Sequence, residues 1–329
     1  MKNSHKYLRI YLLSLFTVIL AATVLRSIAI LTELDFTSGY FDNKVIISIA
    51  NGLVMAMALL SLTYFAVAKH GELVASFGGA VTYVPSGLVA VALIFISAEL
   101  LSTNIIARGG TVMGFFTALL ALVSVAHFLY NALIVKKENS HRAWFSLATI
   151  IFLAAYATYL YFDVSLPLNS PNKIVDMMAF LFSALFFLYE TRISLGRDSW
   201  RAYISFGIIA SLITAYSSIP SIITYFVRGE VISNSITETA LTFTLFIFIT
   251  ARLLMVSELK DNEKSEIAAL VFEMEARRKE QIKENIAARE QSELNEANSE
   301  EEDNNYRIQT LYPENGEEAP DTTEEGDEV

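Results

Sequence analysis

Hydrophobic positions along this chain gather in long blocks, and short polar segments separate the blocks. Each block has about the twenty residues that an α-helix needs to cross the hydrocarbon core of a bilayer. A helix of a soluble domain shows an apolar stripe instead of an uninterrupted apolar run. The pattern therefore predicts an all-α fold, a polytopic transmembrane helical bundle of eight spans. The expected spans cover residues 10–31, 45–68, 85–102, 111–135, 143–162, 174–190, 203–227 and 240–256.

The first block has two interpretations, a cleavable signal peptide or a membrane span, because Lys2, Lys6 and Arg9 precede it. Its apolar run extends from Ile10 to Leu31, which exceeds the roughly 7–15 apolar residues of a signal peptide. No clear small-x-small cleavage site follows the run. We therefore expect this block to be a span.

Two prolines and one arginine give local expectations. Pro85 suits the first turn of the third span, where its missing N–H costs nothing. Pro220 should kink or break the seventh span in its last third. Arg26, near the end of the first span, is expected to snorkel or to pair with Glu33 or Asp35.

Basic residues are divided unevenly between the two alternating sets of connecting segments, with thirteen in one set and five in the other. Lys and Arg are retained on the cytosolic side of the plasma membrane, so the richer set predicts that both termini are cytosolic. An even number of spans agrees with this orientation. The richer set holds Lys2, Lys6, Arg9, Lys69, Lys136, Lys137, Arg142, Arg192, Arg197, Arg201, Arg252, Lys260 and Lys264. The poorer set holds Arg26, Lys44, Arg108, Lys173 and Arg228.

A possible duplication relates the first four spans to the last four. Residues 43–45 (Asn-Lys-Val) correspond to residues 172–174 (Asn-Lys-Ile), and other matches lie at offsets of 125 to 128 residues. Two halves of four spans would be parallel repeats. Chance similarity in the rhythm of loops and spans is the alternative.

The pattern changes after Val256, where charged residues replace the apolar run. Acid-first i,i+4 pairs predict a cytosolic charged helix over residues 257–293. If it continued unbroken from the last span to Arg289, roughly 50 helical residues would extend about 75 Å.

Residues 294–329 are rich in acidic residues and turn formers, which predicts a disordered acidic tail. One less acidic segment of this tail, with Arg307, Leu311 and Tyr312, is a candidate docking peptide for a cytosolic protein partner. A neutral patch in a solvated tail is the alternative.

Composition and charge refine this picture. The chain is 53% hydrophobic and 18% charged, with a mean hydropathy of +0.44, as expected for a protein whose main partner is the lipid bilayer. Its formal charge is −11, but residues 295–329 hold thirteen acidic residues and one arginine, so residues 1–294 carry about +1. An acidic soluble part disfavours nucleic-acid binding, because phosphate would repel it. Cysteine is absent, which excludes disulfides and thiolate metal sites.

Three polar residues within the spans are candidates for chemistry. Glu99 lies near one end of the third span, where an ionisable group is costly unless it faces protein, water or the interface. His127 and Asn131 are four residues apart, on one face of the fourth span. Together they could mark a proton or solute route, but Glu99 lies towards the other membrane surface. Hydrogen bonding between helices is the default interpretation.

Carboxylates are concentrated at the predicted outer ends of the spans. A cation site there is conceivable, and acidic loops without a function are the alternative. The carboxylates are Glu33, Asp35, Asp42, Asp163, Asp176 and Glu238. At the predicted inner boundary, Glu190 and the arginines that follow it are interpreted as topology signals that could attract anionic lipid.

Motifs that carry enzymatic chemistry are missing. The sequence has no H-E-x-x-H pattern, P-loop, G-x-S-x-G elbow or paired metal-ligand cluster. We therefore expect no enzyme, no cofactor and no metal.

The run Leu-Pro-Leu-Asn-Ser-Pro-Asn-Lys over residues 166–173, followed by Leu-Tyr-Glu-Thr-Arg over residues 188–192, resembles an uncharacterised family of multi-pass membrane proteins of Gram-positive bacteria. The resemblance covers two of the eight spans. It implies a bacterial plasma membrane, and it implies no function because that family has no assigned activity.

Two functional hypotheses follow. The first is an anchor, sensor or scaffold whose residues 257–329 engage a cytosolic partner, because a long charged helix and tail are costly additions to a simple carrier. The alternative is a transporter of ions or small solutes, suggested by Glu99, His127, Pro220 and the possible duplication. The scarcity of polar residues within the spans argues against transport. A structural role in a homo-oligomer is a third possibility.

Overall fold

The computed structural model describes residues 4–258, apart from residues 37, 68–72, 76–79, 107–110, 134–140, 164–166, 168–169, 196, 198 and 233–234. Within these residues, eight helices are long and apolar enough to cross a membrane, which confirms the predicted all-α bundle of a multi-pass membrane protein. The helices are α1 (Ser4–Glu33), α2 (Val45–Val67), α3 (Ala80–Ile106), α4 (Val112–Leu133), α5 (His141–Phe162), α6 (Pro171–Ser194), α7 (Trp200–Arg228) and α8 (Ile236–Leu254).

Two short antiparallel strand pairs mark the two ends of the bundle. At one end, called the hairpin end, β1 (Leu34–Asp35) pairs with β2 (Tyr40–Phe41) between α1 and α2. Gly39 has a φ of 72° in the turn of this hairpin, a conformation that glycine adopts at no steric cost. At the other end, called the β3–β4 end, β3 (Leu73–Ala75) pairs with β4 (Val256–Glu258).

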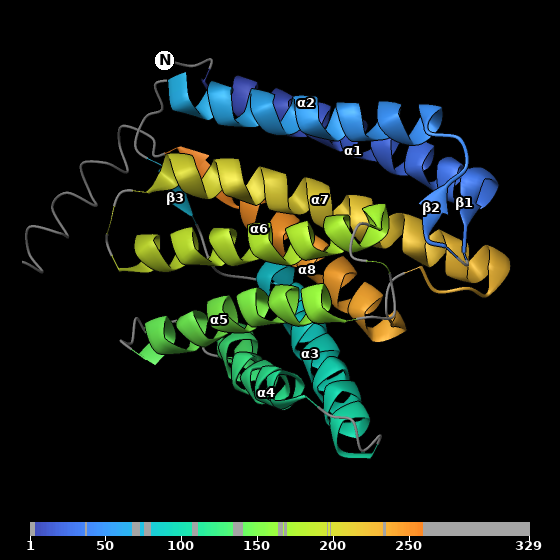
Figure 1. Ribbon diagram of the computed structural model, residues 1–329. Helices are drawn as coiled ribbons and strands as arrows, with labels where there is room; N and C mark the ends of the chain where they lie inside the picture. Colours follow the sequence, from blue (N-terminus) through green and yellow to red (C-terminus); the bar gives the residue numbers. More distant parts are fainter. Residues whose placement is uncertain are drawn as a thin grey trace, which may run out of the picture. The chain divides into compact units, whose positions relative to one another are not determined.

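Helices α3 to α8 form a closed ring in which each helix packs against the next and α8 returns to pack against α3. Helices α1 and α2 pack against each other and against α7, outside this ring (Figure 1). Helix α7 therefore has protein on two sides. Its span is 78% buried, whereas the span of α2 is 22% buried and faces the surroundings.

The two halves of the bundle pack differently. In the second half, α5, α6, α7 and α8 each contact the next helix. In the first half, α1 packs on α2 and α3 packs on α4, whereas the main contacts of α2 beyond α1 are with α7. The proposed duplication stays a prediction that these contacts do not support.

Both prolines lie inside continuous helices. Helix α3 begins at Ala80, so Pro85 lies beyond the first turn, and the expected helix start at Pro85 is wrong. Pro220 lies within α7, which continues to Arg228 and is not broken. A proline removes one backbone hydrogen bond, and dense packing of the surrounding helix can hold the remaining turns in place. A kink at Pro220 stays a prediction.

Helix α8 ends at Leu254, because its last turn tightens and the chain then becomes extended. The Met255 N–H donates to the Arg252 carbonyl at 3.2 Å, and residues 256–258 pair with β3. An unbroken helix from the last span to Arg289 is therefore excluded. The remainder of the charged helix expected over 257–293 and the acidic tail expected over 294–329 lie outside the described residues. The candidate docking residues Arg307, Leu311 and Tyr312 lie outside them too.

Candidate functional site

An ion pair is buried inside the ring near the β3–β4 end. Arg252 Nε on α8 lies 3.4 Å from Glu190 Oε1 on α6, and these side chains are 1% and 6% exposed. The Arg252 guanidinium also lies 5.1 Å from the centre of the Phe248 ring. Burying two charges carries a large desolvation cost, which their mutual attraction offsets in good geometry. The pair therefore links α6 and α8 across the ring.

His127 and Asn131 lie in the ring at the same end, on α4. Asn131 Nδ2 is 3.1 Å from His127 Nε2, and both residues are buried. The His127 ring packs edge-on against Phe187, with centroids 5.9 Å apart. The residues share one helix face as the sequence predicted, and they lie beside an aromatic layer.

The aromatic layer consists of Phe128, Phe187 and Phe248, contributed by α4, α6 and α8. The centroid distances are 5.6 Å from Phe128 to Phe187, 5.3 Å from Phe128 to Phe248 and 5.6 Å from Phe187 to Phe248. All three side chains are fully buried. Aromatic rings at these distances fill the ring interior with apolar contacts.

A second group of charges, the carboxylate cluster, lies towards the hairpin end of the ring, with Asp176 and Glu238 buried and Glu99 and Asp163 half-buried. It consists of Glu99 on α3, Asp163 directly after α5, Asp176 on α6 and Glu238 on α8, and Glu238 is within electrostatic range of the other three. Glu238 and Asp176 are 1% and 4% exposed. The sequence had placed these carboxylates at the outer ends of the spans, and the structure turns Asp176 and Glu238 inwards.

Hydroxyl groups bind two members of the carboxylate cluster. Thr237 on α8 donates a hydrogen bond to Glu99 Oε2. Ser217 on α7 donates to Asp176 Oδ1. Within the part of the chain that the structure describes, no group of three or more His, Asp or Glu side chains is arranged to hold a metal ion.

Arg26 connects the pair formed by α1 and α2 to the ring. Its Nη2 donates to Asn172 Oδ1 on α6 at 2.9 Å, and its guanidinium lies 4.4 Å from the centre of the Tyr216 ring on α7. Tyr216 in turn donates to Asn51 Oδ1 on α2 at 2.6 Å. Arg26 is 2% exposed, so the expectation that it snorkels or pairs with Glu33 or Asp35 is wrong.

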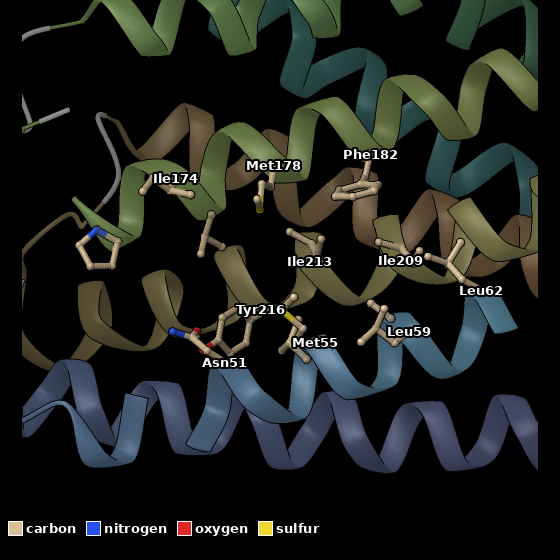
Figure 2. Close-up of a pocket in the computed structure, with 14 residues that line it drawn as sticks. Asn51, Met55, Leu59, Leu62, Ile174, Met178, Phe182, Ile209, Ile213 and Tyr216 are labelled. Atoms are coloured by element: carbon tan, nitrogen blue, oxygen red, sulfur yellow. The ribbon is translucent and has the colours of Figure 1, made fainter. Parts of the chain in front are cut away.

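A lateral groove of about 480 Å³ lies outside the ring between α2 and α6, with α7 as its floor (Figure 2). Its walls are apolar, and Asn51 and Tyr216 are the polar residues among those that line it. The groove borders side chains such as Met55 and Leu59 that are 67% and 55% exposed. It is therefore an outward-facing apolar feature separate from the charges inside the ring.

The sequence-predicted polar residues do not meet in one site. Glu99 lies with the carboxylate cluster, and His127 and Asn131 lie near the opposite end, as their positions in antiparallel spans had indicated. Sequence reasoning missed the pairing of Glu190 with Arg252, because both had been interpreted as boundary charges. A signal was present: Leu-Leu-Met-Val follows Arg252, so that charge lies within the apolar run.

Comparisons with known proteins found no matching family model, no matching curated protein and no matching solved structure. The resemblance to membrane proteins of Gram-positive bacteria therefore stays a prediction.

Proposed function

We propose that the α3–α8 ring transports small cations across the membrane. The observation that carries this proposal is the distribution of buried charge inside the ring. The carboxylate cluster lies near one end, the Glu190–Arg252 pair near the other, and the aromatic layer lies between them. Charged side chains within spans are costly, and they commonly mark the route of an ion.

The sign of the charge supports a cation as the transported species. Four carboxylates gather towards the hairpin end, whereas the opposite end has a balanced ion pair. The aromatic layer would keep the route closed at rest, and a change in helix packing would open it. This closure in the middle of a route is a general feature of proteins that alternate access between two sides.

The structure also weakens the main argument against transport. The sequence suggested that polar residues within the spans are few and belong to boundaries. Glu190, Arg252, Asp176 and Glu238 are all buried between helices. Helix-to-helix bonding alone remains the competing explanation, and a flux measurement separates the two.

The test uses the purified full chain in sealed lipid vesicles, with gradients of H⁺, Na⁺ and K⁺ and indicator dyes inside. We expect at least one of these cations to move faster than in empty vesicles. Asp176→Asn should reduce that flux by about tenfold or more, the effect of losing roughly 1.4 kcal/mol of cation stabilisation. Asp42→Asn is the matched control, because Asp42 is an exposed carboxylate at the hairpin end. Vesicles that move none of the three cations would overturn the proposal.

The hypothesis of an anchor or sensor depends on residues 257–329, of which residues 257 and 258 are described. It stays a prediction. Affinity capture after crosslinking in cells, with the full chain and a chain truncated after Leu259, tests it. A cytosolic protein held by the full chain and lost on truncation would support it, and identical captures would contradict it.

A further inference from the structure

We infer that Glu238 is a proton-binding site inside the ring, which makes H⁺ a transported or coupled ion of the proposed transporter. The inference rests on the proposed function for its role in transport, but the binding of a proton stands on the side chain's own surroundings.

The local sequence suggests a structural role for Glu238 that the structure does not bear out. Ser235 and Glu238 have the spacing of a capping box, in which the serine binds the third N–H of the helix and the glutamate binds back to the serine N–H. The serine half is formed, since the Glu238 N–H donates to Ser235 Oγ at 3.1 Å. Neither carboxylate oxygen of Glu238 has a hydrogen-bond partner among the described residues. The side chain therefore does not serve as a cap.

Glu238 also differs from its acidic neighbours in the hydrogen bonds that its carboxylate accepts. Glu99 accepts a hydrogen bond from Thr237, and Asp176 accepts one from Ser217. Among the residues described, no Lys, Arg or His forms an ion pair with Glu238. With its side chain 1% exposed, an ionised carboxylate there would be desolvated and uncompensated.

Charged and titratable groups face Glu238 from three helices of the ring. Glu99 faces it from α3, Tyr156 and Asp163 from α5 and its end, and Asp176 from α6. The Tyr156 hydroxyl is close to the carboxylate without forming a hydrogen bond of ordinary geometry. On the side of α7 and α1, Arg26 lies against the Tyr216 ring and is within electrostatic range of Asp176. Three acidic groups therefore lie around one buried carboxyl, and no basic group among those described forms an ion pair with it.

Two cations lie beside other members of the carboxylate cluster, Lys173 beside Asp163 and Arg26 within electrostatic range of Asp176. Lys173 is buried, and its Nζ donates to the Asp163 backbone carbonyl. Arg26 donates to Asn172 and lies against the Tyr216 ring. Neither cation forms an ion pair with Glu238.

A proton fits this site better than a metal ion. A metal ion needs several oxygen ligands directed at one point, and the described carboxylates do not converge in that way. A proton needs one carboxylate oxygen. In the proposed step, hydronium at the hairpin end gives a proton to the Glu238 carboxylate, forming the neutral acid and water. Release at the other side reverses the step, so no oxidant or further reactant is involved.

The direct test is infrared difference spectroscopy of the full chain in lipid vesicles, from mildly acidic to alkaline pH. A protonated buried carboxyl gives its own carbonyl stretching band. We expect this band in the wild type, its loss at alkaline pH, and its absence from Glu238→Gln, which has the shape of the neutral acid. Glu230→Gln is the matched control, because Glu230 is an exposed carboxylate at the hairpin end, and it should keep the band. Glu238→Asp, a second variant, should shift the band without removing it, whether or not Glu238→Gln folds.

Three further outcomes separate the proton site at Glu238 from the proposed transport. A wild type without the band, or a band unchanged in both Glu238 variants, would overturn the proton site. If vesicles move Na⁺ or K⁺ and Glu238→Gln leaves the pH dependence of that flux unchanged, the role of Glu238 in transport is overturned and transport stands. If the band titrates and no cation moves, transport is overturned and proton binding stands.

Discussion

Buried charges in this protein are satisfied in different ways, and the differences decide what each residue contributes. Arg252 has an acidic partner in Glu190, whereas Arg26 has an amide and an aromatic face. Glu238 has neither a cation nor a hydrogen bond to its carboxylate among the residues described. Removing a partner from a buried pair leaves a charge in a poor solvent, which is more damaging than removing an exposed charge.

We predict that Glu190→Ala destabilises the protein by about 3–5 kcal/mol, because it leaves Arg252 buried without its acidic partner. Thermal unfolding of the purified protein in detergent measures the effect. Glu230→Ala is the matched control, since Glu230 is exposed, and it should change stability by less than about 0.5 kcal/mol. The double variant Glu190→Leu with Arg252→Met should recover most of the loss. Equal stability of the two alanine variants would refute the prediction.

For single residues, the sequence predicted which positions within the spans are polar, but it did not predict which way their side chains point. It identified Glu99, His127 and Asn131 as polar residues within spans, and it indicated that His127 and Asn131 share a face. It could not show that Glu190 and Arg252 meet, because a charge at the end of an apolar run can turn to the interface or to a neighbouring helix. That choice depends on which helices are adjacent, and hydropathy does not contain this information.

Among the elements, α7 is the helix around which packing is tightest, since it contacts both the ring and the pair of α1 and α2. Gly207 permits one of its close approaches. A Cβ at this position would lie 2.8 Å from Leu253 Cδ2 and 3.0 Å from Phe186 Cδ2. Contacts this short require the Leu253 and Phe186 side chains to shift, or α6 and α8 to move away from α7.

Gly207→Ala should therefore destabilise the protein by about 1–3 kcal/mol, the usual cost of overpacking. Gly87→Ala provides the control, because a Cβ there meets nothing within 4 Å and alanine favours the helix. The comparison uses melting temperatures of the purified variants. A melting temperature for Gly207→Ala at or above that of Gly87→Ala would show that the neighbouring side chains move aside freely.

The hydrophobic pattern predicted every one of the eight described helices, with ends that differ by up to six residues. It did not predict the ring, because closure requires α8 to pack on α3 across a long stretch of sequence. It also did not predict β4. The extended residues 256–258 are stabilised by pairing with β3, and such a contact between distant segments leaves no periodic signal in either one.

For the whole molecule, the distribution of basic residues predicts that the hairpin end faces outwards. The chain lacks cysteine, so single introduced cysteines give unambiguous labels. In intact cells, a membrane-impermeant maleimide should label Asp42→Cys and Glu230→Cys, which lie at the hairpin end. Leu195→Cys and Arg201→Cys lie at the other end and should be labelled after permeabilisation. All four positions are exposed. The reverse labelling pattern would show that the hairpin end faces the cytosol.

The pairing of β3 with β4 gives the protein a mechanical coupling that hydropathy would not suggest. Any pull on the chain beyond Glu258 enters the membrane unit through β4, whose partner β3 belongs to the connection between α2 and α3. A force on β4 therefore acts both on α8, which precedes β4, and on the connection between α2 and α3, which contains β3. Through this pairing the end of α8 is joined directly to the connection between α2 and α3, so a displacement of either segment is passed to the other.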